Sequence, residues 1–398
     1  MIRSVAFTIG LLRKLQSRFA HRIGEFKSFD RSLRKKYPFS MNAIPRTDLP
    51  LPERGALLLR TPAESGYRMP AEWAPHECCW MAWPSRADQW PDGFGGAQSN
   101  YAAVAHAIRR FEPVRMVVEP SGTKQARALC GSDIELIELP IDDPWMRDSG
   151  PTFLASAGGG ARAGTAWRFN SWGGKSPEYA DNARLAGRVL SIAGRPVYQS
   201  SLCLEGGAIH TDGEGTVITT ESVVLNANRN PGITKSAAER ELCEALGATK
   251  IIWLPGDPES LFTDITDGHV DGLVSYVGPG LVLYESDPSA SGPTLKLAAE
   301  NRHALETATD ASGRRLKIIS IDDAYEVKTP HALFSRSYVN FYIANGGIVM
   351  PSFGVPGDAR ARAVVQAAFP GREIVQIDIT HLASGGGGIH CITQQQPA

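Results

Sequence analysis

The pattern of apolar positions divides most of the chain into alternating helices and strands. Apolar residues recur at helical spacing over several stretches, and each stretch is followed by a short apolar run that is typical of a buried strand. The helices are predicted at 100–111, 177–192, 234–246, 294–311 and 358–369, and the strands that follow them at 114–118, 197–199, 250–254, 316–320 and 373–377. Further short strands are predicted at 216–219, 280–284 and 347–350. Five units in one order predict a single, radially repeated α/β domain.

The first 60 residues depart from this pattern. Ten Lys or Arg and only two acidic residues lie between positions 3 and 36. Helical spacing relates the apolar residues Leu12, Leu15, Phe19, Ile23 and Phe26. An amphipathic basic helix of this kind would be a transit-type leader or a membrane-surface helix, and the alternatives are a disordered extension or sequence upstream of a true start at Met41. We therefore divide the chain into an extension, 1–60, and a globular domain, 61–398.

Composition narrows the class of protein. The chain has 398 residues with 42% hydrophobic and 21% charged residues, which is ordinary for a globular protein. A formal net charge of −1 disfavours nucleic-acid binding, since such proteins usually carry a basic excess. No apolar run approaches the ~18 residues that span a bilayer, so we expect no stable membrane insertion. The six cysteines show no disulfide-framework spacing, which favours a reducing, cytoplasmic compartment. The sequence leaves open whether the protein forms a homo-oligomer.

The C-terminus carries the first candidate for chemistry. Four glycines, 385–388, are followed closely by Cys391. Glycines allow close approach to the backbone, so a small ligand could reach a thiol placed behind them. We predict that Cys391 is a nucleophile. The alternative is a glycine-rich tail with a buried, inert cysteine.

A second candidate lies between residues 142 and 151. This segment contains Asp142, Asp143, Trp145, Arg147 and Asp148. Proline and glycine break regular structure here, and loops on a rigid scaffold often carry binding groups. Carboxylates with an aromatic wall at Trp145 predict a site for a cation, with Asp142 among its binding groups. An ordinary turn, in which the aspartates bond their own backbone, is the alternative.

Two further segments supply a histidine and more carboxylates. On a strand, His269 and Asp271 would point to the same face and form a candidate general acid/base. A metal site would need a third ligand, but none lies at a familiar spacing; a solvated turn is the other alternative. Glu205 precedes Gly206 and Gly207, which indicates either a buried acceptor near a ligand or a surface turn. Together the thiol, the histidine and the carboxylates suggest nucleophilic catalysis on a guanidinium, which pairs bidentately with carboxylates.

Seven collinear motifs resemble those of the agmatine deiminases, members of the guanidine-modifying superfamily related to the bacterial-type peptidylarginine deiminases. They cover nearly all of the chain from residue 69 onward. The matching segments are 69–73 with 80–84, 145–151, 169–174, 204–207, 266–271, 337–347 and 385–396.

The resemblance implies a five-bladed α/β propeller of the pentein type and a hydrolase that acts on C–N bonds of linear amidines. In that family pattern Cys391 forms an amidino-cysteine intermediate, and His269 protonates the departing ammonia and then activates water. Asp148 and Asp271 clamp the guanidinium. Trp145 flanks the substrate and Glu205 is an accessory carboxylate. No metal or organic cofactor is implied, and agmatine would give N-carbamoylputrescine, an intermediate of putrescine biosynthesis.

Departures from the pattern keep other functions open. Gly388 stands where the family has Asn, and Val355 stands where it has Asp, so the pocket mouth could differ. Within the reaction class, a peptidyl- or free-arginine deiminase is the alternative. A non-catalytic, polyamine-binding propeller and a metal-dependent hydrolase are alternatives from other classes. The metal ligands would be His269, Asp271, His390 and Cys391.

Overall fold

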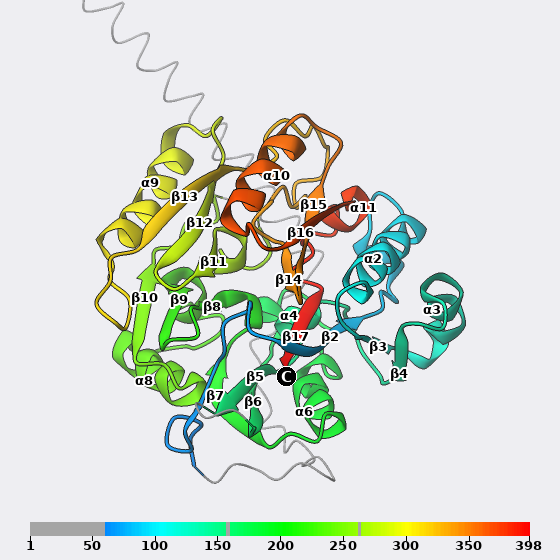
Figure 1. Cartoon of the computed structure of the whole chain (residues 1–398), viewed down its shortest axis with the longest axis horizontal. Helices are drawn as coiled ribbons and strands as arrows, with labels where there is room; N and C mark the ends of the chain where they lie inside the picture. The colour runs from blue at the N-terminus through cyan, green and yellow to red at the C-terminus, as the bar shows by residue number, and fades with distance from the viewer. Residues whose placement is uncertain (1–59, 157–159, 262–263) are drawn as a thin grey trace, which may run out of the picture. The chain divides into compact units, whose positions relative to one another are not determined.

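The computed structural model describes residues 60–156, 160–261 and 264–398, which form a mixed α/β fold (Figure 1). The extension predicted at 1–60 lies outside these residues, apart from Arg60. Within the described residues the strands form five separate sheets. The first has the order β17-β2-β3-β4, with β2 (His76–Ala82), β3 (Val114–Val118), β4 (Glu135–Glu138) and β17 (Thr393–Pro397). The second has the order β1-β5-β6-β7, with β1 (Tyr67–Arg68), β5 (Thr152–Ser156), β6 (Arg162–Arg168) and β7 (Val197–Cys203).

The other three sheets have three strands each. The third has the order β10-β9-β8, with β8 (Ile209–Thr211), β9 (Thr216–Thr220) and β10 (Lys250–Leu254). The fourth has the order β11-β12-β13, with β11 (Val274–Gly278), β12 (Leu281–Ser286) and β13 (Lys317–Asp322). The fifth has the order β14-β15-β16, with β14 (Tyr342–Ala344), β15 (Gly347–Ser352) and β16 (Glu373–Asp378).

One topology recurs in all five sheets. In each sheet a strand pairs antiparallel with one neighbour, a helix follows this strand, and the next strand pairs parallel with it. In four sheets the antiparallel neighbour comes just before in the sequence, whereas in the first sheet it is β17. Parallel neighbours need a long crossover connection, usually a helix, so each amphipathic stretch of the sequence has a topological role. The crossover helices are α2 (Phe94–Arg109), α6 (Asn182–Ile192), α8 (Lys235–Leu246), α9 (Gly292–Thr307) and α10 (Gly357–Ala368). The five predicted helix-then-strand units are therefore confirmed, although several helix bounds differ by a few residues.

The ends of these helices have local causes. Helix α8 begins where it was predicted, because the Thr234 hydroxyl accepts the Ala237 N–H at 3.2 Å, and Gly247 ends it at φ 62°. Helix α6 begins later than predicted. The Asp142 carboxylate accepts the N–H groups of Asp181 and Asn182 at 2.7 and 3.1 Å, which fixes its start.

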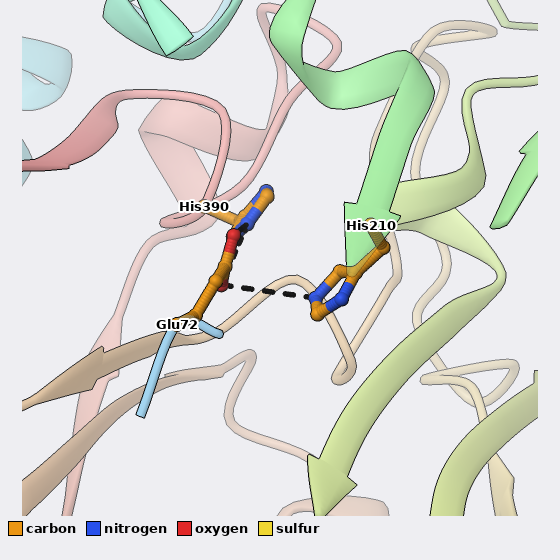
Figure 2. Close-up of side chains that lie close together, drawn as sticks. All are labelled: Glu72, His210 and His390. Carbon is orange, nitrogen blue, oxygen red and sulfur yellow. Dashed lines mark hydrogen bonds and ion pairs between the residues drawn. The ribbon is translucent and has the colours of Figure 1, made fainter. Parts of the chain in front are cut away.

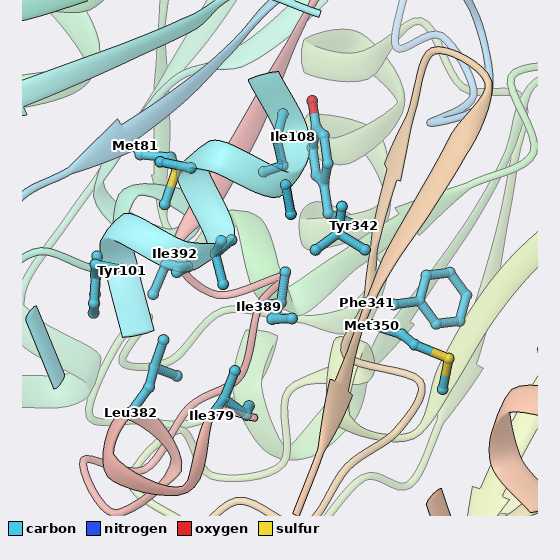
Figure 3. Close-up of a cluster of buried hydrophobic side chains, with 14 of the residues drawn as sticks. Met81, Tyr101, Ile108, Phe341, Tyr342, Met350, Ile379, Leu382, Ile389 and Ile392 are labelled. Carbon is cyan, nitrogen blue, oxygen red and sulfur yellow. The ribbon is translucent and has the colours of Figure 1, made fainter. Parts of the chain in front are cut away.

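The largest apolar core anchors the C-terminal chain (Figure 3). It includes the fully buried Ile389 and Ile392, which pack with residues of helix α2 and of the fifth sheet. After Ile392, strand β17 pairs antiparallel with β2. Burial of both isoleucines therefore fixes the two residues between them, His390 and Cys391.

Shorter helical segments complete the described fold. The α-helical ones are α3 (Thr123–Cys130), α4 (Met146–Ser149), α5 (Ser171–Gly174), α7 (Glu221–Val224) and α11 (Thr380–Ala383). The 3-10 turns are η1 (Ala87–Gln89), η2 (Pro120–Gly122), η3 (Gly206–Ala208) and η4 (Val270–Gly272). In the described residues no helix is both long and apolar enough to cross a membrane.

Candidate active site

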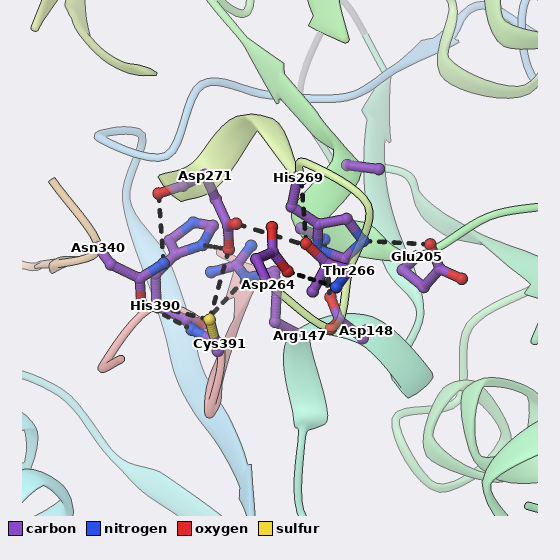
Figure 4. A network of polar contacts seen from close by, with 12 residues as sticks. Arg147, Asp148, Glu205, Asp264, Thr266, His269, Asp271, Asn340, His390 and Cys391 are labelled. Carbon is purple, nitrogen blue, oxygen red and sulfur yellow. Dashed lines mark hydrogen bonds and ion pairs between the residues drawn. The ribbon is translucent and has the colours of Figure 1, made fainter. Parts of the chain in front are cut away.

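A cavity of about 620 Å³ brings together residues that are far apart in the sequence. Its lining includes His269, Asp271, Asn340 and Cys391 (Figure 4). Asp148 and Glu205 lie directly beside His269. Five of the residues predicted for the site therefore lie together: Cys391, His269, Asp271, Asp148 and Glu205.

Asn340 holds Cys391 in place. Its side-chain oxygen accepts the Cys391 N–H at 3.3 Å and lies 3.4 Å from the Sγ. The Sγ also lies 3.7 Å from Oδ2 of Asp271. From the other side, the Arg147 N–H donates to the Cys391 carbonyl at 3.1 Å. The thiol is half-buried and reaches the cavity, whereas the backbone around it is fixed.

The glycine run lets this loop pack against tryptophans. A Cβ added at Gly387 would lie 2.4 Å from the Trp145 ring, and one at Gly385 would lie 2.4 Å from the Trp90 ring. Trp145 itself packs on Trp90, with ring centroids 5.6 Å apart. Trp145 is thus buried against the loop that carries Cys391, but it is not among the residues that line the cavity, so its role as an aromatic wall for a cation stays a prediction.

Helix α4 carries Asp148 into the site. Its Oδ2 accepts the Trp172 Nε1–H at 2.9 Å, and its Oδ1 accepts the Gly207 N–H at 3.0 Å. The carboxylate is buried, and Nδ1 of His269 lies 3.7 Å from its Oδ1. Burial, partly offset by His269 and reinforced by Asp271 and Glu205, raises the pKa of Asp148 to about 6.

His269 and Asp271 do not lie on a strand, so that part of the sequence prediction is wrong. His269 directly precedes the 3-10 turn η4, which contains Asp271. Asp267 and Gly268 have positive φ of 64° and 91°, which extended strand geometry does not allow. Even so, the 3-10 turn brings Nδ1 of His269 to 4.0 Å from Asp271 Oδ1, so the predicted proximity stands for a different reason.

The surrounding carboxylates favour a charged His269. Burial alone would lower the pKa of this imidazole, but Asp148, the hydrogen bond to Glu205 and Asp271 together raise it to about 9. Nε2 of His269 lies 3.1 Å from Glu205. Burial raises the pKa of Glu205, but Arg229 and His269 together outweigh this effect and lower it, so Glu205 stays ionised. Nε of Arg229 lies 2.9 Å from each carboxylate oxygen.

Cys391 has the opposite electrostatic setting. Burial, Asp271 and Asp148 all raise the pKa of its thiol well above 9, and the hydrogen bond to Asn340 offsets this only in part. At neutral pH the unliganded site therefore pairs a thiol with an imidazolium.

Gly207 lets three charged groups pack closely against the backbone. A Cβ at this position would lie 2.7 Å from His269 Nδ1, 2.8 Å from Asp148 Oδ1 and 2.9 Å from Asp271 Oδ2. Any side chain here would therefore displace the imidazole or one of the two carboxylates. The two carboxylates, held beside the cavity, suit a planar cation that pairs bidentately with carboxylates.

Asp142 is not brought into this group. Its carboxylate caps helix α6, as described above, and Asp142 does not line the cavity. We therefore assign Asp142 a structural role in place of the predicted substrate-binding role, because its carboxylate accepts two backbone N–H groups at the start of helix α6. Arg147 is also directed away from the cavity and pairs with buried Glu72 at 3.1 Å.

Several residues around the site were not predicted from the sequence. The structure adds Asn340 beside the thiol, Trp172 on Asp148, Arg229 on Glu205, and Glu72 behind His390. Asn340, Trp172 and Glu72 belong to segments that carried the family resemblance, which was the one available signal. Gly388 lies directly against Asn340, since a Cβ at Gly388 would lie 2.5 Å from the Asn340 side-chain oxygen.

The α/β fold and this cysteine–histidine–carboxylate site define a protein built for covalent chemistry on a cation. The chain belongs to the Porphyromonas-type peptidyl-arginine deiminase family, whose model matches residues 68–397. It is 43% identical over 363 residues to the agmatine deiminase of Pseudomonas aeruginosa strain LESB58, covering 85% of this chain and 97% of that protein. A putative agmatine deiminase of Streptomyces avermitilis is 43% identical over 347 residues, covering 85% of this chain and 99% of that one.

Solved structures agree with this assignment. The agmatine deiminase of Enterococcus faecalis matches with a TM-score of 0.78 and 33% identity, covering 86% of this chain and 99% of that one. A putative arginine deiminase from Porphyromonas gingivalis matches with a TM-score of 0.75 and 28% identity, covering 83% and 98%. The predicted resemblance to this family is therefore confirmed.

Proposed function

We propose that this protein hydrolyses the guanidinium group of agmatine to N-carbamoylputrescine and ammonia through a covalent intermediate on Cys391. It is a hydrolase of the deiminase family that acts on C–N bonds of amidines. The observation that carries the proposal is the convergence of Cys391, His269 and Asp271 on one cavity, with Asp148 directly behind.

Substrate binding places the guanidinium in the cavity beside Cys391 and His269. Asp148 and Asp271 accept its N–H groups, and Trp145, which packs against Gly387 of the cavity lining, flanks the substrate. Fixing the planar cation between the carboxylates aligns its carbon with the thiol, which replaces a bimolecular encounter by a positioned one. The bound positive charge also offsets the two carboxylates that raise the pKa of Cys391, so that the thiol releases its proton to solvent.

The first half-reaction forms a thiouronium. The Cys391 thiolate attacks the guanidinium carbon and a C–S bond forms. The His269 imidazolium donates its proton to one amino nitrogen. The C–N bond then breaks, ammonia leaves, and His269 remains neutral. Glu205 and Asp148 stabilise the imidazolium before this transfer.

The second half-reaction hydrolyses the intermediate. Neutral His269 takes a proton from a water molecule, whose oxygen attacks the carbon of the thiouronium. The C–S bond breaks, the sulfur leaves as thiolate, and the new hydroxyl group on the carbon gives its proton to this thiolate, which forms the urea carbonyl and restores the Cys391 thiol. The sum is consumption of one water and release of one ammonia and of the proton that Cys391 gave to solvent, with His269 again protonated.

The cavity lining favours an amine over an α-carboxylate. Beyond the residues placed in the mechanism, it carries the acidic side chains of Asp264, Glu285, Asp287 and Asp323. Among the lining residues that the structure describes, Arg336 is paired with Asp287 and Asp323 at 3.4 and 3.5 Å, and His331 is bonded to Asp92. This charge balance supports agmatine, which ends in an ammonium, over arginine, which ends in a carboxylate.

The remaining features of the proposal concern the whole chain. We propose that the five sheets are the blades of one five-bladed α/β propeller, and that residues 61–398 form one catalytic domain after an N-terminal extension, 1–60. The repeated topology supports the first point. We also propose a cytoplasmic enzyme that works on a small guanidinium substrate without metal or cofactor.

The test is ammonia release from agmatine by the purified full chain. We expect turnover by the wild type and by Cys243→Ala, a control for another half-buried cysteine, and none by Cys391→Ala. Arginine and a peptidyl-arginine substrate are measured beside agmatine, and a higher kcat/KM for either would overturn the choice of substrate. Turnover by Cys391→Ala would overturn the nucleophile.

A further inference from the structure

A second, fully buried cluster of charged groups lies behind Cys391 and does not reach the cavity. It consists of Glu72, Arg147, His210 and His390, each at most 2% exposed. Figure 2 shows Glu72, His210 and His390. Nε2 of His390 lies 2.9 Å from Oε1 of Glu72, and Nη1 of Arg147 lies 3.1 Å from the same oxygen. The proposed reaction does not use these groups, and burying so much charge is costly unless the charges are paired.

The bonds of His390 define its charge. Nδ1 lies 2.9 Å from Asp271 Oδ2, and Nε2 lies 2.9 Å from Glu72 Oε1. An ionised carboxylate only accepts hydrogen bonds, so both ring nitrogens must donate. An imidazole that donates at both nitrogens is an imidazolium. His390 is therefore a buried cation between two carboxylates, one of which belongs to the active site.

The other groups around His390 fit this charge. The positive charge of Arg147 disfavours the imidazolium, and the Arg147 Nε donates to the His390 carbonyl at 3.3 Å. The carboxylates of Glu72 and Asp271 favour the imidazolium. The His210 ring stacks on His390 with centroids 5.9 Å apart, and burial lowers the pKa of His210 to about 4, which keeps it neutral. Two anions thus face two cations, and the cluster is balanced.

The same side chains could be considered as metal ligands. Donor atoms of Glu72, His210 and His390 lie within 4.8 Å of one another. However, the Arg147 guanidinium already donates to Glu72, and its positive charge would repel a metal ion placed there. A charge network explains all the contacts, whereas a metal site leaves Arg147 against its ligands.

From this geometry, and resting on the function proposed above, we infer that Glu72 and His390 are positioning residues that keep Asp271 ionised and turn its Oδ2 toward Cys391. Glu72 holds the proton on Nε2, so His390 presents a charged donor to Asp271. Oδ2 of Asp271, which accepts that bond, is also the oxygen 3.7 Å from the Cys391 Sγ. Through Asp271 the buried pair therefore controls the carboxylate that receives the substrate.

Three variants separate this role from a merely structural one. Glu72→Gln keeps the shape and removes the charge. His390→Asn keeps an amide donor near the position of Nδ1 and removes the ring charge, and Glu72→Asp keeps the carboxylate. The matched control is Glu112→Gln, because Glu112 and His76 form another buried pair, 3.1 Å apart, outside the site.

Enzyme kinetics give the first measurement. Without the full charge of His390, Asp271 protonates more easily and its pKa rises. The acid limb of the pH profile of kcat/KM therefore moves to higher pH. We expect Glu72→Gln and His390→Asn to lower kcat/KM for agmatine by about 10- to 100-fold at pH 6. We expect the loss to be smaller at pH 8, Glu72→Asp to recover part of it, and Glu112→Gln to keep the wild-type pH profile. An equal loss at both pH values in Glu72→Gln and His390→Asn, with a normal melting temperature, would overturn the inference.

Nitrogen NMR of ¹⁵N-histidine-labelled protein gives a second measurement that needs no turnover. The His390 signals, identified by their absence in His390→Asn, should be those of an imidazolium at pH 7 in the wild type, and should change toward the neutral form in Glu72→Gln. Neutral signals in the wild type would overturn the inference, and so would signals that shift with added Zn²⁺ and return with a chelator. If agmatine is not turned over at all, the proposed function fails while the charge of His390 is still measured.

Discussion

Glu205 lies 3.1 Å from Nε2 of His269, and both side chains are almost completely buried. On its other side, Glu205 pairs with Arg229, so one carboxylate links an arginine to the proposed proton donor. The sequence placed Glu205 only as an accessory group. Its position makes it the main hydrogen-bonding partner of His269, with consequences for the pH dependence of the enzyme.

The first prediction concerns Glu205→Gln. His269 must be protonated to assist ammonia departure, and its pKa of about 9 depends in part on Glu205. Because the substitution removes a negative charge, the pKa of His269 falls and the alkaline limb of kcat/KM moves to lower pH, by about one unit. The pH profile of agmatine turnover checks this, with the exposed pair variant Glu221→Gln as control. An unmoved alkaline limb would contradict the role assigned to Glu205.

The second prediction concerns Gly207. A methyl group there would lie less than 3 Å from His269, Asp148 and Asp271, so these side chains would have to leave the positions proposed for catalysis. We expect Gly207→Ala to lower kcat/KM by at least about 100-fold. The matched control is Gly187→Ala on helix α6, where a Cβ meets no atom within 4 Å and alanine favours the helix. Near-normal turnover by Gly207→Ala would contradict the roles proposed for these three side chains at their present positions.

The third prediction concerns the resting state of Cys391. Since burial and two carboxylates raise the pKa of its thiol well above 9, alkylation by iodoacetamide should be slow at pH 7 and should keep accelerating beyond pH 9. Inactivation rates across pH measure this, and labelling of Cys391→Ala gives the background from Cys243. A plateau below pH 8 would show a thiolate in the free enzyme.

The five helix-then-strand units were predictable because each crossover helix must cover a sheet, which imposes apolar residues at helical spacing. Cys391, His269 and Asp271 were predictable because their residue types carry the chemistry. The strand on which His269 and Asp271 would have shared a face is absent for a local reason. A histidine and an aspartate two residues apart fit a strand and a turn equally well in the sequence. Only the positive φ of Asp267 and Gly268 shows that this segment is not a strand.

Other features depend on contacts that no local pattern contains. Glu72 and His390 are separated by 318 positions, and Asn340 lies 51 positions from Cys391. Asp142 illustrates the same limit, because the N–H groups it caps lie 39 and 40 positions away. A carboxylate in a loop fits a binding role and a capping role equally until the partner helix is placed. Which of these roles it has is decided by packing between sheets.

The fourth prediction concerns Asp143, which lies beside the site but outside the proposed mechanism. Burial raises the pKa of its carboxyl group to about 8, although the Gln89 amide donates to its Oδ2 at 2.7 Å. The folded protein therefore holds a proton that the unfolded chain releases near pH 4, so the free energy of unfolding decreases as pH rises from about 4 to 8.

Asp143→Asn should remove this dependence, because an amide has no proton to lose in that range. We expect the variant to gain stability over the wild type progressively between pH 4 and 8, reaching about 1–3 kcal/mol above pH 8, with agmatine turnover retained. Urea unfolding at pH 5 and pH 8.5 measures the difference between the two proteins. An equal difference at both pH values would mean that Asp143 is ionised in the folded protein throughout, and that its buried oxygens have a partner not yet identified.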